Sequence, residues 1–375
     1  MRVLILVDEF FASRERSMLA RLEIGLADEG VRVIHAVPDS DLNRPQVGAM
    51  GGVFRSMVPY SRRVLSVTRG LAARRIVRNL ALIDDADEPD PIDVVHVFGG
   101  SVWELGRRLA GALDAGLALE VWRAGLVQRA VRGPQRSGGN RPVFLAPDTA
   151  IESALRTGGV SVRPTYWGVH ASEPPREVVP PGRAPSAMFI GSGRQTKPFQ
   201  SAFEGVASSF QRNGDGLIFV DALAARRAGI WKIAERLGVL NRLSLIEELE
   251  SRRDLLLQGD FLIQPESAGE HKSVVLDAMS NGMLVIAAAD RFISCLIDGR
   301  TANLVPVPAA ASGGDAWSAM IDRLLARPAD RRAIAASAHQ FIRSNRLASA
   351  HIRAVLDAYM WMTASEAIPF PSETA

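Results

Sequence analysis

The residues whose types and spacing indicate chemistry lie in the segment 260–306. An apolar run, Phe261-Leu262-Ile263, is too short for a helix and predicts a buried parallel strand. A turn-rich stretch that contains Glu270 follows, and Ser273 can cap a helix that ends near Asn281. The first N–H groups of that helix, and the positive end of its dipole, face the carboxyl end of the strand. This arrangement is a natural binding site for a phosphate group.

Two lysines support the phosphate interpretation. The chain has 44 lysines and arginines together, and only three of them are lysines. Because arginine is so common, a single arginine is weak evidence of function, and the rare lysines say more. Lys272 directly precedes the expected helix, and Lys197 follows another expected strand with a Gly turn, residues 187–191. Both lysines therefore lie where a phosphate is expected.

The elements that would position these residues predict an α/β protein. Residues 2–7 predict a buried parallel strand, residues 8–13 the loop at its carboxyl end, and residues 18–29 a helix with apolar residues at helical spacing. Residues 31–34 predict the next strand, and this order is typical of a doubly wound domain. The first loop lacks the Gly-x-Gly-x-x-Gly pattern, which argues against a dehydrogenase.

The length of 375 residues is sufficient for two domains. We expect an N-terminal Rossmann-like domain over residues 1–172 and a C-terminal one over residues 186–345. Between them, residues 173–185 contain five prolines, which exclude a helix or a central strand and indicate a linker. Residues 346–375 are expected to form a last helix and a tail.

The composition excludes several classes of protein. With 47% hydrophobic and 23% charged residues, the chain is globular rather than disordered. A single cysteine, Cys295, excludes an intramolecular disulfide and suits a reducing cytosol. No apolar run reaches the roughly 20 residues of a membrane span, and the N-terminus has no signal-peptide pattern. We therefore expect a cytoplasmic protein, and a net charge of only +3 gives no reason to expect a nucleic-acid partner.

A basic helix is expected from Arg62 to Leu82. Seven arginines and no acid lie between residues 55 and 78, and the apolar residues between them are compatible with one buried face. The simpler interpretation is a solvated face. The alternative is a peripheral contact of Arg62–Arg78 with an anionic membrane, on its inner face, because a basic amphipathic helix can make one.

The second half of the chain resembles a known family. Residues 277–279 (Asp-Ala-Met), Gly282, the strand 284–286 and the run 298–306 (Asp-Gly-Arg-Thr-Ala-Asn-Leu-Val-Pro) resemble the donor segment of the retaining glycosyltransferases of GT-B fold, family four. Asp277 stands where that family has the second of two glutamates. Glu270 precedes it with six residues between them, where the family has seven.

The resemblance implies a fold and a reaction. The fold is α/β, with two Rossmann-like doubly wound domains that face each other across a cleft. The reaction is transfer of a sugar from a nucleotide-sugar donor to a hydroxyl acceptor, a glycan or a lipid-linked sugar, with retention. No cofactor is implied, because the nucleotide-sugar is a substrate. No metal is implied either, because no His, Asp and Cys cluster has ligand spacing and cationic side chains can serve instead.

The resemblance also implies roles for individual residues. Lys197 is in register with the family's diphosphate-binding lysine, and Arg194 is two residues from the position of its arginine. Two cations there would neutralise the charge that builds on the departing nucleoside diphosphate. Glu270, the catalytic candidate, would hydrogen-bond the donor sugar, and Asp277 would accept hydrogen bonds from the ribose. The remaining candidates are His271, Lys272 and Ser273 on the donor side and Ser13 and Arg123, in two strand-exit loops, on the acceptor side.

Other interpretations remain open. One is a non-catalytic relative that keeps the nucleotide-sugar site, suggested by the altered glutamate spacing and by the lack of a histidine after Val121. Another makes Glu270 and Asp277 ordinary helix-start and helix-surface acids. An isomerase of the same fold is disfavoured, because the N-terminal half lacks the acid and histidine set that we would expect.

Overall fold

The computed structural model describes residues 1–39, 56–61, 66–84, 90–133, 142–171, 175–214 and 216–364. The first of its two parallel sheets has the strand order β3-β2-β1-β4-β5-β6-β7. Its strands are β1 (Arg2–Val7), β2 (Arg32–Pro38), β3 (Met57–Tyr60), β4 (Val94–Phe98), β5 (Gly116–Glu120), β6 (Val143–Ala146) and β7 (Val162–Pro164).

The second sheet has the order β10-β9-β8-β11-β12-β13 and is also parallel throughout. Its strands are β8 (Ser186–Phe189), β9 (Leu217–Asp221), β10 (Leu243–Ile246), β11 (Phe261–Gln264), β12 (Leu284–Ala288) and β13 (Asn303–Val305). The central strands β11 and β12 are buried along their whole length, as expected for apolar runs in a parallel sheet covered on both faces. The fold class expected from the sequence is therefore confirmed.

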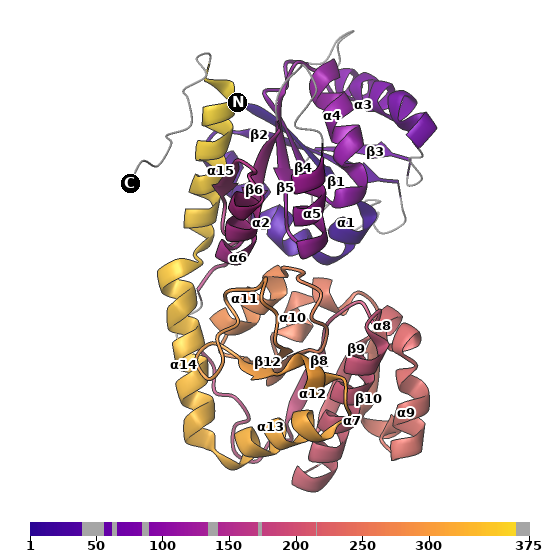
Figure 1. Ribbon diagram of the computed structural model, residues 1–375, viewed down its shortest axis with the longest axis vertical. Coiled ribbons are helices and arrows are strands. Elements are labelled where there is room, and N and C mark those ends of the chain that lie inside the picture. The colour runs from indigo at the N-terminus through magenta and orange to yellow at the C-terminus, as the bar shows by residue number, and fades with distance from the viewer. Residues whose placement is uncertain are drawn as a thin grey trace.

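Helices connect the strands in each half. Those of the first half are α1 (Glu9–Arg14), α2 (Arg16–Asp28), α3 (Arg69–Ile83), α4 (Trp103–Ala112), α5 (Ala124–Arg132) and α6 (Thr149–Thr157). Those of the second half are α7 (Thr196–Asn213), α8 (Ala222–Ala228), α9 (Ile230–Leu237), α10 (Arg253–Leu256), α11 (Ser273–Ser280), α12 (Val307–Ala310), α13 (Asp315–Ala326) and α14 (Pro328–Asn345). The last helix, α15 (Ala348–Thr363), returns from α14 to the first half, where it packs against α2, β4 and β5 (Figure 1).

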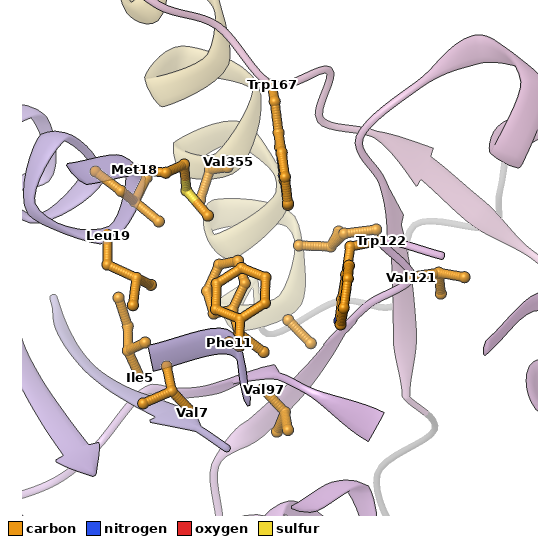
Figure 2. Packing of buried hydrophobic residues seen from close by; sticks show 14 of the residues in the cluster. Ile5, Val7, Phe11, Met18, Leu19, Val97, Val121, Trp122, Trp167 and Val355 are labelled. Atoms are coloured by element: carbon orange, nitrogen blue, oxygen red, sulfur yellow. The ribbon is translucent and has the colours of Figure 1, made fainter. Parts of the chain in front are cut away.

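The apolar core continues across the boundary between the two halves. Figure 2 shows Phe11 among buried side chains that come from β1, α2, β4 and α15, with Trp122 and Trp167 beside it. The same cluster includes residues of β11 and α11 in the second half. A second cluster packs on the other face of the second sheet, around the phenylalanines of α7. Apolar packing therefore contributes to the contact between the halves.

The chain crosses between the halves twice, and the two crossings are hydrogen-bonded to each other. Val169 N–H donates to the carbonyl of Arg346 at 2.8 Å, and Ala348 N–H donates to the carbonyl of Val169 at 3.0 Å. A Cβ on Gly168 would lie 2.1 Å from the carbonyl oxygen of Leu347, so only glycine allows this approach. No helix or strand occurs over residues 175–185, the described part of the expected linker.

One local expectation was wrong. Residues 9–13 are not a loop but part of α1, because the Asp8 carboxylate caps this helix by accepting from Phe11 N–H at 2.9 Å. In the second half, the helical pattern of residues 222–237 is broken into α8 and α9 at Gly229, whose φ is +67°. Only the short elements η4 (Leu249–Ser251) and α10 follow β10, and Glu248 before them has a φ of +53°.

The basic helix is described from residue 66 onward. It consists of the 3₁₀ turn η1 (Ser66–Thr68) and α3, while Arg62 and Arg63 lie outside the described residues, as do residues 365–375 of the expected tail. None of the described helices is long and apolar enough to cross a membrane.

Candidate active site

The loops at the carboxyl ends of the two sheets face each other. The first half contributes α1, which follows β1, and the loop after β5; the second half contributes the loops after β8, β10 and β11. The carboxyl ends of strands in a parallel sheet all lie at one edge, which is where α/β proteins bind ligands. In this chain the two edges touch, so the candidate site is built from both halves.

The loop after β5 and the loop after β11 are joined by their backbones. His271 N–H donates to the carbonyl of Trp122 at 2.9 Å, and Ala124 N–H donates to the carbonyl of Gly269 at 3.0 Å. Gly269 has a φ of +62°, and a Cβ on it would lie 2.5 Å from the Cβ of Ala124, so this contact requires glycine. It places the guanidinium Nη1 of Arg123 3.8 Å from Oε1 of Glu270. The catalytic candidate and an acceptor-side candidate thus form an ion pair across the boundary.

Ser273 does not cap α11 as the sequence suggested. Lys272 is the N-cap residue and makes no side-chain capping bond, and Ser273 is the first helical residue. Its N–H donates to Oε1 of Glu15 at 3.2 Å, and its hydroxyl donates to Oε2 of the same side chain. Burial raises the pKa of Glu15, although the charge of Arg253 opposes this. A carboxylate from the first half therefore already lies at the positive end of α11.

The turn after β8 also binds carboxylates of the chain itself. Glu266 accepts from Ser192 N–H and, at 2.9 Å each, from the Ser192 hydroxyl and Gln195 N–H. Glu250 accepts from Gly191 N–H at 2.9 Å. The two cations predicted for this turn, Arg194 and Lys197, have exposed side chains and form no ion pair within the described part of the chain. The amides of the turn are thus occupied, while its cationic side chains are available.

Asp277 is paired with two arginines. Its Oδ1 lies 2.9 Å from Nη1 of Arg21, which belongs to the first half, and its Oδ2 lies 3.2 Å from Nε of Arg253. The side chains of Arg21 and Asp277 are only 12% and 10% exposed. The carboxylate predicted to accept from ribose hydroxyls is therefore held by guanidinium groups in this closed arrangement.

Lys272 and Glu250 form a buried ion pair of the second half. Nζ of Lys272 lies 2.8 Å from Oε1 of Glu250, with side-chain exposures of 7% and 3%, and Arg14 Nη1 lies 3.7 Å from the same oxygen. Burial opposes ionisation of Glu250, but the charges of Lys272 and Arg14 outweigh it and lower its pKa to about 2. Glu250 is therefore a carboxylate acceptor throughout the physiological range.

His271 and Ser13 have local partners. Nε2 of His271 lies 2.7 Å from the carbonyl oxygen of Phe292, and burial lowers the pKa of this imidazole, which therefore donates as a neutral ring. The Ser13 hydroxyl donates to the carbonyl of Phe10 within α1, and its own carbonyl accepts from the Ser251 hydroxyl of the second half. Ser13 thus contributes its backbone to the boundary, while its hydroxyl is used inside its own helix.

Two aromatic rings at the boundary stack on each other, and an arginine lies over each of them. Phe10 and Trp122 stack with their centroids 5.6 Å apart and 22° between the planes. The guanidinium of Arg14 lies 4.3 Å from the centre of the Phe10 ring, and that of Arg123 lies 5.2 Å from that of Trp122. The two arginines face Glu250 and Glu270, respectively.

Cavities of two kinds lie beside the loop after β11. Two small ones, both lined by Glu270, His271 and Lys272, each have room for about one water molecule. A wider hollow of about 690 Å³ lies at the ends of β11, β12 and β13, against Ala124 of the first half, and Gly269, Asp290 and Phe292 line it. Its size is that of a small-molecule site. In the described residues, no three His, Cys, Asp or Glu side chains are arranged to hold a metal ion.

The sequence pointed to part of this site. Glu270, Lys272, Ser273 and Asp277 all lie at the boundary, but Arg194 and Lys197 are outside the ion-pair network. Sequence reasoning missed Glu15, Glu250 and Glu266, because their partners are distant in the chain. Glu15 and Ser273 are 258 residues apart, and Glu266 and Ser192 are 74 residues apart.

Known protein structures resemble this chain along nearly its whole length, although no protein-family profile and no curated protein matches its sequence. A sucrose-phosphate synthase from Thermosynechococcus elongatus has 15% identity and a TM-score of 0.73, covering 98% of this chain and 100% of the other. A glycosyltransferase from Rickettsia africae has 12% identity and a TM-score of 0.70, covering 97% and 99%.

The structure of Anabaena HepE in complex with UDP and glucose has 13% identity and a TM-score of 0.70. It covers 96% of this chain, and the match extends over 99% of HepE. At such identities the shared feature is the arrangement of the backbone. Together with the two facing parallel sheets and the helix that returns to the first half, these matches identify the fold of this chain as GT-B.

Proposed function

We propose that the protein is a glycosyltransferase that transfers a sugar, of hexose type, from a nucleotide-sugar donor to a hydroxyl acceptor with retention. The proposal rests on one observation. Loops from both sheets contact each other through charged and aromatic side chains, and a hollow of about 690 Å³ lies beside this contact. HepE, which shares the fold, is described with UDP and glucose, which supports a donor of this class.

The diphosphate of the donor would be held by side chains. The amides of residues 191, 192 and 195 bind Glu250 and Glu266, whereas Arg194 and Lys197 at the start of α7 are exposed. Two cations beside the leaving group stabilise the charge that develops on it, so a metal ion is not required. Glu270 would bind hydroxyls of the donor sugar, and His271, Lys272 and Ser273 would line the same end of the site.

Binding of a nucleotide would require the two halves to separate. Asp277 can accept from ribose hydroxyls only after its oxygens leave Arg21 or Arg253, which now lie 2.9 and 3.2 Å away. Separation would also free Arg123 from Glu270, so that Arg123 and Ser13 would be on the acceptor side of an open cleft. The structure described here then represents the closed state.

Two measurements test the function. A thermal-shift screen with UDP, GDP and ADP should raise the midpoint of unfolding with one nucleotide selectively, because a ligand that binds only the folded state stabilises it. Incubation with the matching nucleotide-sugar and EDTA should release the nucleoside diphosphate. Absence of any shift, together with absence of release from every nucleotide-sugar tried, would contradict the proposal.

The second candidate is a non-catalytic relative that binds a nucleotide-sugar. It is favoured by one observation: Glu266 accepts three hydrogen bonds from the turn after β8, and a carboxylate in that place repels a diphosphate. Selective nucleotide binding without release or transfer, in the same experiments, would favour this candidate over the first.

The acceptor is proposed to be a glycan or lipid-linked sugar at the inner face of the membrane, with the protein in the cytoplasm. Helix α3 has an exposed stripe, with Leu71 and Leu82 66% and 69% exposed and three arginines between them (74, 75 and 78). The spacing of these five residues places them on one face of the helix. Leucines beside arginines, without an acid, are suited to an anionic lipid surface.

Flotation with liposomes tests this contact. Vesicles containing phosphatidylglycerol should bind the protein at low salt and release it at high salt. The double variant Leu71→Ser/Leu82→Ser should bind less, whereas Leu223→Ser, at an exposed leucine of α8, should bind as the original protein does. If the double variant floats equally well, α3 is not the contact.

A further inference from the structure

The edge strands of the two sheets differ in how they are protected. An edge strand can pair with another chain unless a proline, a charge or a covering segment prevents it. β3 contains Pro59, and β7 contains Arg163 and Pro164. At β13, the N–H of Leu304 donates to Oδ1 of Asp298 at 2.8 Å, so the preceding loop covers that edge. β10 reads Leu-Ser-Leu-Ile and has neither a proline nor a charge.

The β10 edge is also accessible. Leu245, inside the strand, is 38% exposed. Apart from the ladder with β9, residues 244–246 form no hydrogen bond within the described part of the chain. Alternate residues of an edge strand direct their N–H and C=O groups away from the sheet. β10 therefore offers backbone donors and acceptors to a further strand.

An exposed tryptophan lies on the helix beside this edge. Trp231 of α9 is 55% exposed, and Figure 1 shows α9 at the outer margin of the second half. Arg236 of α9 pairs with Glu204 of α7, and five residues turn a helix by about 140°, so Trp231 lies on a different side from α7. Leu243 packs against the cluster that contains residues of α7 and α9, and Leu245, two residues on, points to the same face of the sheet. Trp231 and Leu245 thus add apolar surface on one side of the β10 edge.

The residues that flank β10 match those of a second copy of the chain. Arg242 directly precedes the strand, and Glu247 and Glu248 directly follow it. In an antiparallel pair related by a two-fold axis, the start of one strand lies beside the end of the other. Arg242 of each copy then approaches the acids of the other copy, and opposite charges across such a pair stabilise it. The charge pattern of β10 is therefore complementary to itself.

We propose that β10 is the interface of a two-fold symmetric dimer of this chain. The β10 strands of two copies pair antiparallel and join the two second sheets into one continuous sheet, and Trp231 and Leu245 of each copy are covered at the junction. The interface lies in the second half alone, so the first half of each copy remains free to move. The inference does not depend on the proposed function, because none of the candidate site residues takes part in the pairing.

Sedimentation velocity of the full chain over a series of concentrations tests the dimer. The native mass should be twice that of one 375-residue chain. Leu245→Lys should raise the dissociation constant of the dimer about tenfold or more, because it places a charge near its own symmetry mate at an edge that must be desolvated. Ile24→Lys is the matched control: Ile24 is 58% exposed on α2, in the first half, and this variant should remain dimeric. Thermal unfolding of both variants checks that they are folded.

Three results would overturn the proposal. The first is a mass of one chain at every concentration. The second is a dimer that Leu245→Lys leaves as stable as the original, since the interface would then lie elsewhere. The third is a monomeric full chain that becomes dimeric when residues 365–375 are removed, since a segment of the chain itself would then cover the edge. If Leu245→Lys does not fold, Trp231→Ser replaces it and should likewise weaken the dimer; an unchanged dissociation constant would again overturn the proposal.

Discussion

Two buried polar clusters of this protein differ in whether their groups are ionised. Beneath the first sheet, His96 Nδ1 lies 2.7 Å from the Tyr359 hydroxyl, its Nε2 lies 3.3 Å from Glu120, and Glu120 accepts from Trp167 Nε1 at 2.8 Å. Burial raises the pKa of Glu120 to about 8 and lowers that of His96 to about 3. At neutral pH, this cluster is therefore a network of neutral groups.

The cluster at the boundary keeps its charges. Glu250 is ionised, with a pKa of about 2, and Glu250, Glu270 and Asp277 are each paired with an arginine from the other half of the chain. A neutral network has no reason to separate, whereas ion pairs can exchange partners with water or with a ligand. The first cluster holds α15 on the first sheet, whereas the second consists of ion pairs between the two halves that can exchange partners.

The largest effect is expected from Glu120→Gln. The raised pKa of Glu120 means that its proton stabilises the folded state; this contribution is complete below about pH 4.5 and is lost as the pH rises through about 8. Glutamine keeps a donor and an acceptor and cannot ionise. The free energy of unfolding of the variant, relative to the original protein, should rise by about 1.4 kcal/mol per pH unit over that interval. Urea unfolding at several pH values measures it.

The original protein, unfolded in urea at the same pH values, is the reference for this prediction. A difference for Glu120→Gln that does not change between pH 4.5 and 8 would mean that Glu120 is ionised when folded, and the contrast between the clusters would disappear.

Asp277→Asn should have the next largest effect. It removes the counter-charge of Arg21 and one of the two acids beside Arg253, in a place that is about nine-tenths buried, which costs about 2–4 kcal/mol of unfolding free energy. Arg21→Ala in the same background should add less than it costs alone, because the pair is already broken. Additive effects of the two substitutions would show that this pair does not couple the halves.

The substitution Gly269→Ala tests the backbone contact between the loop after β5 and the loop after β11. Gly269 and Gly238 have φ values of +62° and +69°, but only at Gly269 would a Cβ meet another atom, 2.5 Å away in Ala124. Alanine at Gly238 should cost about 1 kcal/mol of unfolding free energy, and alanine at Gly269 about 2–3 kcal/mol. Only the latter should also reduce release of nucleoside diphosphate. If both alanine variants lose the same unfolding free energy, the loops leave room for a Cβ at residue 269.

Lys197→Ala should have the smallest effect on stability, below about 0.5 kcal/mol, because the side chain is exposed. Affinity for the nucleoside diphosphate should nevertheless fall, by about five- to tenfold, if this cation holds the phosphates. Lys232→Ala, at an exposed lysine of α9, is the matched control and should change neither quantity. An unchanged affinity in Lys197→Ala would remove this lysine from the site.

Much of the fold could be predicted from the sequence, because it depends on local patterns. The buried strands at residues 2–7 and 261–264 follow from apolar runs, and the end of α11 at Ser280 follows from the glycine turn at Gly282. The broken helix at Gly229 could not, since an isolated glycine inside a helical pattern is often tolerated.

The site was less predictable, because its contacts join distant segments. Ser273 was expected to accept a hydrogen bond from an N–H group of its own helix. Instead, the carboxylate of Glu15 accepts from the N–H and the hydroxyl of Ser273. Similarly, the cations that pair with Asp277 come from α2 and α10, and nothing in the local sequence indicates either. The positions of candidate residues can be predicted from motifs, but their partners depend on how the two halves pack.

The two crossings of the chain determine how the halves can move. Val169 and the segment 346–348 are hydrogen-bonded side by side, and Arg346, 4% exposed, also donates to the carbonyl of Pro147 and to the carboxylate of Asp148. Two covalent connections fastened at one place act as a single hinge, so opening is a rotation about one axis rather than a sliding motion. The Arg21–Asp277 and Arg123–Glu270 pairs would then break in one concerted step.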